Sequence, residues 1–392
     1  MSEAQKTSER IHSLDGLRGV ASLAVLLLHV AMMLELWGPD GPYPLVPGTP
    51  AVVVFFVLSG VVLSLGPLAR LRSGRAYDWL AYYPRRVVRL CVPLFVAIAL
   101  GVLAGYVAWH MGSTSRSATA IDFSGGPERV VHDLLMQFDL LFFVSDDTRT
   151  IFGEPLVRVD SPVWSMGWEL WFSLTLPLAI ACLTRVRRDG AAALAILAGI
   201  FVSYWCGYFP LRLCLTFWLG VIVAKHLPEL SRVRLAPAAE LAALLAALGA
   251  IELAQASAAG LLGPLDALAS AALSTLMNVA CAGLVVLAVT DGLVRRALST
   301  RPARFLGSVS FSLYLTHAIV IGGLEAVLPR LGVTAPLVQA GVAVVVSLAF
   351  GTLFWRVVER PSIGLSRRVG ASLAAPSVTR PGEKSKQGEK NV

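Results

Sequence analysis

Residues 17–37, LRGVASLAVLLLHVAMMLELW, are an almost unbroken apolar run, long enough to cross a lipid bilayer as one helix. Nine further runs of comparable length follow along the chain. They lie at 48–66, 90–110, 163–184, 191–208, 211–227, 236–256, 268–290, 306–327 and 336–356. Because backbone polar groups find no water inside a bilayer, each run must be helical. The sequence therefore predicts an all-α, polytopic membrane protein with about ten transmembrane helices.

The overall composition supports the same interpretation. Of the 392 residues, 56% are hydrophobic and 15% are charged, whereas a soluble domain carries about 25% charged residues. Membrane lipid is therefore the expected surrounding of most of the chain. The net charge of +8 comes from short basic clusters between the apolar runs. A nucleic-acid partner would require one continuous basic face with aromatic platforms, so we expect none.

The basic clusters also predict which side of the membrane each segment faces. Arginine and lysine concentrate in cytoplasmic loops. Here they precede the third, fifth, seventh and ninth runs, while the long opposite segment at about 111–160 is acidic on balance. With an even number of spans, both termini are predicted to be cytoplasmic.

We expect one membrane domain at residues 1–368 and a disordered cytoplasmic tail at 369–392. The tail is rich in Ser, Gly, Pro, Lys and Glu, a composition that does not support a packed core. The first apolar run lacks a small-residue cleavage site, so we expect it to be retained as a helix. The apolar run at 134–144 is too short to span. It is an interfacial helix, a lid over a substrate cavity or a buried loop helix.

The common signatures of metal, nucleotide and serine-hydrolase chemistry are missing from the sequence. There is no HExxH, no GxSxG, no GxxxxGK followed by Ser or Thr, and no GxGxxG after a strand. The five cysteines lie in or beside apolar runs without a CxxC pair, which indicates packing residues. We therefore expect neither a metal ion nor a bound cofactor.

Two ionisable residues of the first run lie on one helical face. His29 follows Arg18 by eleven residues, which places them on the same side of a helix about 16 Å apart along its axis. Arg18 would then lie at the cytoplasmic mouth, with Asp15 near the same stripe, and His29 near mid-bilayer. Taken singly, they are an ordinary basic anchor and a packing histidine. Their shared face favours a functional site, because ionisable groups at membrane depth are costly.

Three other places carry polar residues at or near membrane depth. His317 shares a helical face with Tyr314 and lies about as deep as the first imidazole, so the two rings could meet, or each is a hydrogen-bonded core residue. Glu169 lies just inside the fourth run and needs a partner. Arg86 and Arg89 precede the third run, where they would bind phosphate or serve as a positive-inside cluster.

Five short segments, in order along about residues 14–361, are similar to the motifs of the integral membrane acyltransferase type three family. The segments are Leu14-Asp15-Gly16-Leu17-Arg18-Gly19 running to His29, Phe55-Phe56-Val57-Leu58-Ser59-Gly60, Trp164-Ser165 through Glu169, Ser310 through His317, and Glu359-Arg360-Pro361. In two places the chain departs from the family pattern. Pro93 lies one residue farther from Arg89 than expected, and Ser173 stands where an aromatic residue is common.

The resemblance implies an enzyme of the bacterial cytoplasmic (inner) membrane. It would move an acyl group, acetyl or another short chain, from acyl-CoA as co-substrate to a hydroxyl of a sugar, polysaccharide or macrolide acceptor. The implied catalytic residues are His29, Glu169 and His317, and the implied donor- or substrate-binding residues are Asp15, Arg18, Ser59, Arg86, Arg89 and Tyr314. A neutral imidazole at His29 would act as a general base on the acceptor hydroxyl or would carry the acyl group transiently.

Two other functions compete with acyl transfer. A transporter or flippase of a glycosylated or acylated compound is the main alternative, although no internal repeat of the kind that transporters use is visible. A scaffold without catalytic activity would give the ionisable residues on one helix face no purpose. The sequence therefore favours a membrane O-acyltransferase.

Overall fold

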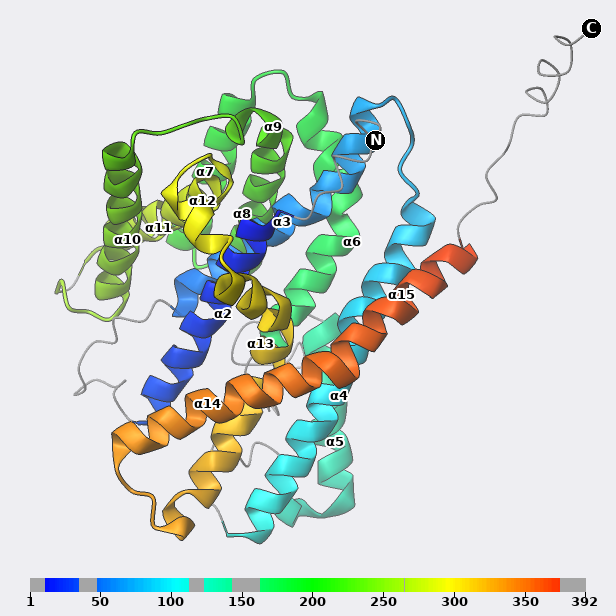
Figure 1. Cartoon of the computed structure of the whole chain (residues 1–392), viewed down its shortest axis with the longest axis vertical. Helices are drawn as coiled ribbons and strands as arrows, with labels where there is room; N and C mark the ends of the chain where they lie inside the picture. The colour runs from blue at the N-terminus through cyan, green and yellow to red at the C-terminus, as the bar shows by residue number, and fades with distance from the viewer. Residues whose placement is uncertain (1–10, 35–47, 113–122, 143–162, 264, 374–392) are drawn as a thin grey trace, which may run out of the picture.

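A computed structural model describes residues 11–34, 48–112, 123–142, 163–263 and 265–373 (Figure 1). All regular secondary structure within these ranges is helical. The long helices coincide with the apolar runs, which confirms the prediction of an all-α, polytopic membrane protein.

Within the described residues, ten long helices correspond one to one with the ten predicted spans. They are α2 (His12–Met33), α3 (Gly48–Arg72), α4 (Trp79–His110), α6 (Val163–Arg185), α7 (Asp189–Trp205), α8 (Phe209–Lys225), α10 (Pro237–Ala258), α11 (Ala267–Val289), α13 (Arg301–Val327) and α14 (Pro336–Phe354). Eight of them are long and apolar enough to cross a membrane. The other two, α7 and α8, have 17 residues each and join in a tight hairpin at Gly207, whose φ of +69° suits glycine.

Shorter elements connect these helices or extend them. They are η1 (Phe123–Gly125), α5 (Gly126–Phe142), α9 (Leu227–Leu230), α12 (Leu293–Leu298), η2 (Pro329–Leu331), η3 (Trp355–Glu359) and α15 (Arg360–Leu373). Most of the short apolar run predicted at 134–144 belongs to α5, which packs against α6. Residues 143–144 of that run lie outside the described ranges. Which face of the membrane each terminus occupies stays a prediction.

The third span begins earlier than the sequence predicted. We expected it at residue 90, with the arginine cluster partly in a loop, but α4 starts at Trp79. The Asp78 side chain caps this helix by accepting a hydrogen bond from the backbone N–H of Ala81 at 2.9 Å. A hydropathy run marks only the apolar part of a helix, whereas the cap decides where the helix starts. Arg86 and Arg89 are therefore helical residues.

The last span continues as one rod through α14, η3 and α15, which crosses the bundle obliquely in Figure 1. The turn η3 is π-helical, with the backbone N–H of Arg360 bonded to the carbonyl of Trp355. Pro361 lacks the N–H that a regular α-helix would use at this point, which accounts for the widened turn. Helix α15 ends at Leu373, so residues 369–373 of the expected tail are helical, and 374–392 lie outside the described ranges.

Glycine contacts hold the central helices close together. α2 and α13 run in parallel, and a Cβ on Gly19 or Gly307 would collide with the backbone of the partner helix. Gly60 of α3 and Gly220 of α8 make the same kind of approach. Small residues permit this packing in membranes, where close van der Waals contact replaces the hydrophobic effect as the driving force. These two helix pairs form the frame of the site described below.

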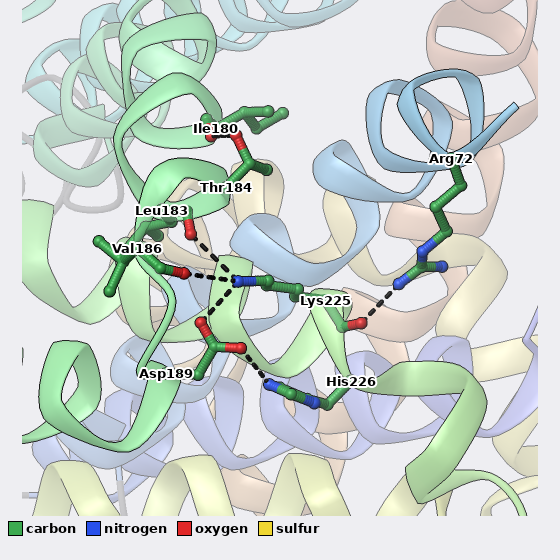
Figure 2. Close-up of polar contacts among 8 residues, drawn as sticks. All are labelled: Arg72, Ile180, Leu183, Thr184, Val186, Asp189, Lys225 and His226. Carbon is green, nitrogen blue, oxygen red and sulfur yellow. Dashed lines mark hydrogen bonds and ion pairs between the residues drawn. The ribbon is translucent and has the colours of Figure 1, made fainter. Parts of the chain in front are cut away.

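A polar cluster ties together the ends of α3, α6, α7 and α8 (Figure 2). The Lys225 ammonium donates to the carbonyl of Leu183 at 3.2 Å and to the Asp189 carboxylate at 2.6 Å. Nε2 of His226 lies 2.8 Å from the other oxygen of Asp189, and Arg72 donates to the backbone carbonyl of Lys225. The cation thus satisfies a carbonyl at the carboxyl end of α6, where helix dipoles favour positive charge.

Candidate active site

A central cavity of about 140 Å³ lies among α2, α3, α4, α6, α13 and η3. Half of its lining residues are apolar, and the polar ones are Asp15, Arg18, Ser59, Arg86, Arg89, Ser165, Glu169, Ser310, Tyr314 and Glu359. Seven of the nine residues singled out in the sequence are among them. The other two, His29 and His317, are absent from this wall. Ser165, Ser310 and Glu359 line the cavity but were not among the expected site residues, although each belongs to one of the recognised motifs.

Arg18 is fixed between α2 and α13. Its Nε donates to Oγ of Ser310 at 2.9 Å, and its Nη2 contacts the Gly307 carbonyl at 3.1 Å and Oδ1 of Asp15 at 3.3 Å. The guanidinium therefore spans the helix pair at the point where Gly307 allows the closest approach. It also forms an ion pair with the carboxylate of Asp15, on its own helix.

Glu169 of α6 is paired with Arg86 of α4 deep inside the protein. Glu169 is 8% exposed, and one of its oxygens accepts from the Arg86 guanidinium. Nε of Arg86 also donates to Oγ of Ser173 at 2.7 Å, while Tyr82 donates to the Ser173 carbonyl at 3.0 Å. Ser173, which departs from the family pattern, thus supplies a hydroxyl acceptor to the arginine. Arg86 is thus the partner that the sequence predicts Glu169 to need.

The third carboxylate of the cavity is Glu359, in the π-helical turn. It is 7% exposed and accepts a hydrogen bond from Ser312 at 2.6 Å. The charges of Arg18 and Arg89 also act on it. The feature of the sequence that could have identified Glu359 is its position two residues before Pro361, at the end of an apolar run. The cavity wall thus holds three arginines and three carboxylates, so its formal charge is balanced.

The two membrane-depth histidines meet between α2 and α13. Nε2 of His317 lies 3.3 Å from Nδ1 of His29, and the rings are 4.8 Å apart at an interplanar angle of 67°. Nδ1 of His29 also lies 2.9 Å from the Val25 carbonyl, and Nδ1 of His317 lies 3.0 Å from the Leu313 carbonyl. The two rings therefore meet, and Arg18 and His29, which the sequence places on one helical face, both contact α13.

The hydrogen bonds define the tautomer of each ring. A carbonyl oxygen only accepts, so Nδ1 carries the proton in both His29 and His317. Nε2 of His317 then accepts from the shared Nδ1–H of His29. Nε2 of His29 keeps a free lone pair, with no hydrogen-bond partner in the described part of the chain. Such a nitrogen is a base held in a fixed orientation.

Tyr314 connects the central cavity with the histidine pair. It lines the cavity, its hydroxyl lies 2.7 Å from that of Ser165, and its ring lies 6.0 Å from the ring of His317. His317 is fully buried, whereas His29 is partly exposed. The pair therefore lies one helical turn beyond Tyr314 and next to the cavity. The sequence places His29 beneath Arg18, and the structure adds Tyr314, which lines the cavity one helical turn before His317.

The described residues contain no group of three or more His, Cys, Asp or Glu side chains able to hold a metal ion. The arrangement offers a fixed imidazole base, a charge-balanced polar cavity and a tyrosine hydroxyl in the cavity wall.

Comparison with known proteins identifies relatives of this chain. A family model described as an acyltransferase domain matches residues 11–356. The chain is 27% identical to Acyltransferase MdmB of Streptomyces mycarofaciens, over 94% of this chain and 95% of that protein. It is 25% identical to O-acetyltransferase PaAT-1 of Phomopsis amygdali over 52% of this chain, and the match spans only 48% of that protein's length. No solved structure matches the chain significantly.

Proposed function

Since the chain belongs to the integral membrane acyltransferase type three family, we propose that it transfers an acetyl or other short acyl group from acyl-CoA to an acceptor hydroxyl. The proposed acceptors are a sugar, a polysaccharide or a macrolide, and the proposed location is the bacterial cytoplasmic membrane. The names of both relatives support acyl transfer. The single observation that carries the mechanism is the imidazole pair, in which Nε2 of His29 is left free.

In the proposed reaction, Nε2 of His29 takes the proton of the acceptor hydroxyl as its oxygen attacks the thioester carbonyl. The C–O bond forms, the C–S bond breaks, and the thiolate of coenzyme A leaves and takes up the proton. His317 holds His29 in the required tautomer through the 3.3 Å contact. An imidazole in a site of low dielectric stays neutral and can accept this proton.

Glu169 is the proposed orienting group for the acceptor. One of its oxygens is bound to Arg86, and the other has no hydrogen-bond partner among the described residues. A carboxylate oxygen of this kind accepts a hydrogen bond from a hydroxyl of the acceptor and so orients it. Tyr314, between the cavity and the imidazoles, and Ser59 in the wall are proposed contacts to the substrates.

The test is transfer by the purified full-length protein in lipid vesicles, with acetyl-CoA as donor and products identified by mass spectrometry. His29→Ala should lower the turnover number about 10²- to 10⁴-fold, the usual contribution of a general base. His110→Ala, an exposed histidine at the end of α4, is the matched control and should keep full activity. Full activity in His29→Ala, with normal insertion, would end the proposed mechanism.

A further inference from the structure

A second cavity, which we call the basic cavity, adjoins the central one. It has a volume of about 320 Å³ and is lined by His12, Asp15, Arg301, Arg304, Phe305 and Ser308. Asp15 lines both cavities. The two cavities therefore share a wall residue in the first turn of α2, on the side that the basic clusters assign to the cytoplasm.

The charges of the two cavities differ. In the central cavity, the guanidinium groups of Arg18 and Arg86 are bound to carboxylates. In the basic cavity, Arg301 and Arg304 are exposed and form no ion pair with any residue that the structure describes. The carboxylate in its wall, Asp15, is already bound to Arg18. Uncompensated positive charge thus gathers in the basic cavity.

Backbone and aromatic groups add to this character. Both α2 and α13 start at the basic cavity, and neither Ile11 nor Thr300, their N-cap residues, caps its helix with a side chain. Free N–H groups at helix starts attract anions, and here two helix ends add their dipoles to the guanidinium charges. Phe305 is 50% exposed in the same wall and offers a flat apolar ring. Cations beside an exposed aromatic ring suit a phosphorylated nucleotide.

We propose that the basic cavity binds the phosphorylated adenosine end of the acyl-CoA donor, an assignment that rests on the proposed acyl transfer. Arg301 and Arg304 bind its phosphates, and the adenine stacks on Phe305. The acyl-bearing arm then passes Asp15 into the central cavity and towards the histidine pair. From Arg304 to His317 the path along α13 is thirteen residues, roughly 20 Å at the rise of an α-helix.

This assignment differs from the one that the sequence suggested. The sequence pointed to Arg18, Arg86 and Arg89 for donor phosphates. Placing several phosphate charges among the carboxylates of the central cavity would require breaking the pairs of Arg18 and Arg86. Buried charges separated from their partners are strongly unfavourable. The basic cavity needs no such rearrangement, because its arginines reach solvent.

The test is binding of coenzyme A and of pantetheine, which lacks the nucleotide, to the detergent-solubilised full chain. The double variant Arg301→Gln/Arg304→Gln should weaken coenzyme A binding about tenfold or more, since each charged hydrogen bond contributes substantially. Pantetheine binding should stay unchanged, and 3′,5′-ADP should compete with coenzyme A in the wild type. The matched control is Arg367→Gln/Arg368→Gln, which removes two exposed arginines of α15 and should bind as the wild type does.

Unchanged coenzyme A affinity in the double variant would overturn the assignment. An equal loss of pantetheine binding would also overturn it, because pantetheine has no nucleotide. The two arginines would then affect binding through a lipid headgroup or through the fold. Acetyl transfer by the same samples separates the two proposals. If the double variant transfers acetyl groups and binds coenzyme A as tightly as the wild type does, only the assignment of the basic cavity is refuted. Arginine-dependent binding without any acyl transfer refutes the proposed function and leaves the nucleotide site standing.

Discussion

The contact between His317 and His29 predicts how strongly the second imidazole affects the first. His317→Phe keeps a ring of similar size but removes the acceptor of the Nδ1–H of His29. His317→Gln retains an acceptor at about the same position. Both variants leave His29 itself in place, so they separate positioning from proton transfer.

The geometry fixes the expected magnitude. The Nδ1–H of His29 is shared between the Val25 carbonyl at 2.9 Å and Nε2 of His317 at 3.3 Å. Because the longer contact is one branch of a shared bond, its loss should cost about 0.5–1.5 kcal/mol, the range for a neutral hydrogen bond. His317→Phe should therefore lower the turnover number about twofold to twelvefold. That is far less than the loss expected for His29→Ala, while His317→Gln should recover most of the activity.

Initial rates of coenzyme A release at saturating acceptor give the turnover number and the KM for each variant, and rates across pH report the titration of the base. A positioning role requires a lower turnover number in His317→Phe, an unchanged donor KM and a partial rescue by glutamine. A loss in His317→Phe as large as that in His29→Ala would refute this reasoning, because His317 would then take part in proton transfer. Thermal unfolding in detergent serves as the control for folding.

Two further predictions concern the stability of the helices around the site. Glu169→Gln or Arg86→Met should each lower the thermal unfolding temperature in detergent, because removing one partner of a buried ion pair costs about 3–5 kcal/mol; the double variant should be less destabilised than the sum of the two, and strict additivity would argue against the pair. Gly307→Ala should destabilise the protein by about 1–3 kcal/mol through overpacking, whereas Gly323→Ala, which meets open space on the same helix, should unfold as the wild type does.

The spans were predictable because the length of an apolar run is a local property of the sequence. Each of the ten apolar runs became a helix, and errors occurred at the ends. The start of α4 at Trp79 depends on the side chain of Asp78, and the helical continuation to Leu373 depends on packing of α15 against α4. Neither is visible in the hydropathy of a single window.

The contacts within the site were predictable only where the spacing of two residues along one helix decides which face they share. Arg18 and His29 lie on one face by their spacing alone, and the structure places both against α13. The pairing of Arg86 with Glu169 joins positions 83 residues apart, which no local pattern predicts. The orientation of Glu359 likewise depends on the widened turn before Pro361. Charge balance in the central cavity follows from such long-range pairings and could not be derived from the sequence.

The residues of the site come from two groups of helices, and one group is the pair α2 and α13, which glycine contacts hold together. The proposed donor contacts and both imidazoles belong to this one tightly joined pair, from Arg301 and Arg304 to His317 and His29. Ser59, Arg86 and Glu169, which face the cavity from the other side, come from α3, α4 and α6. Substitutions on those three helices can therefore reshape the space for a new hydroxyl compound while the proposed coenzyme path keeps its geometry. The proposed function thus predicts that substitutions on α3, α4 and α6 change the acceptor and leave the proposed donor unchanged.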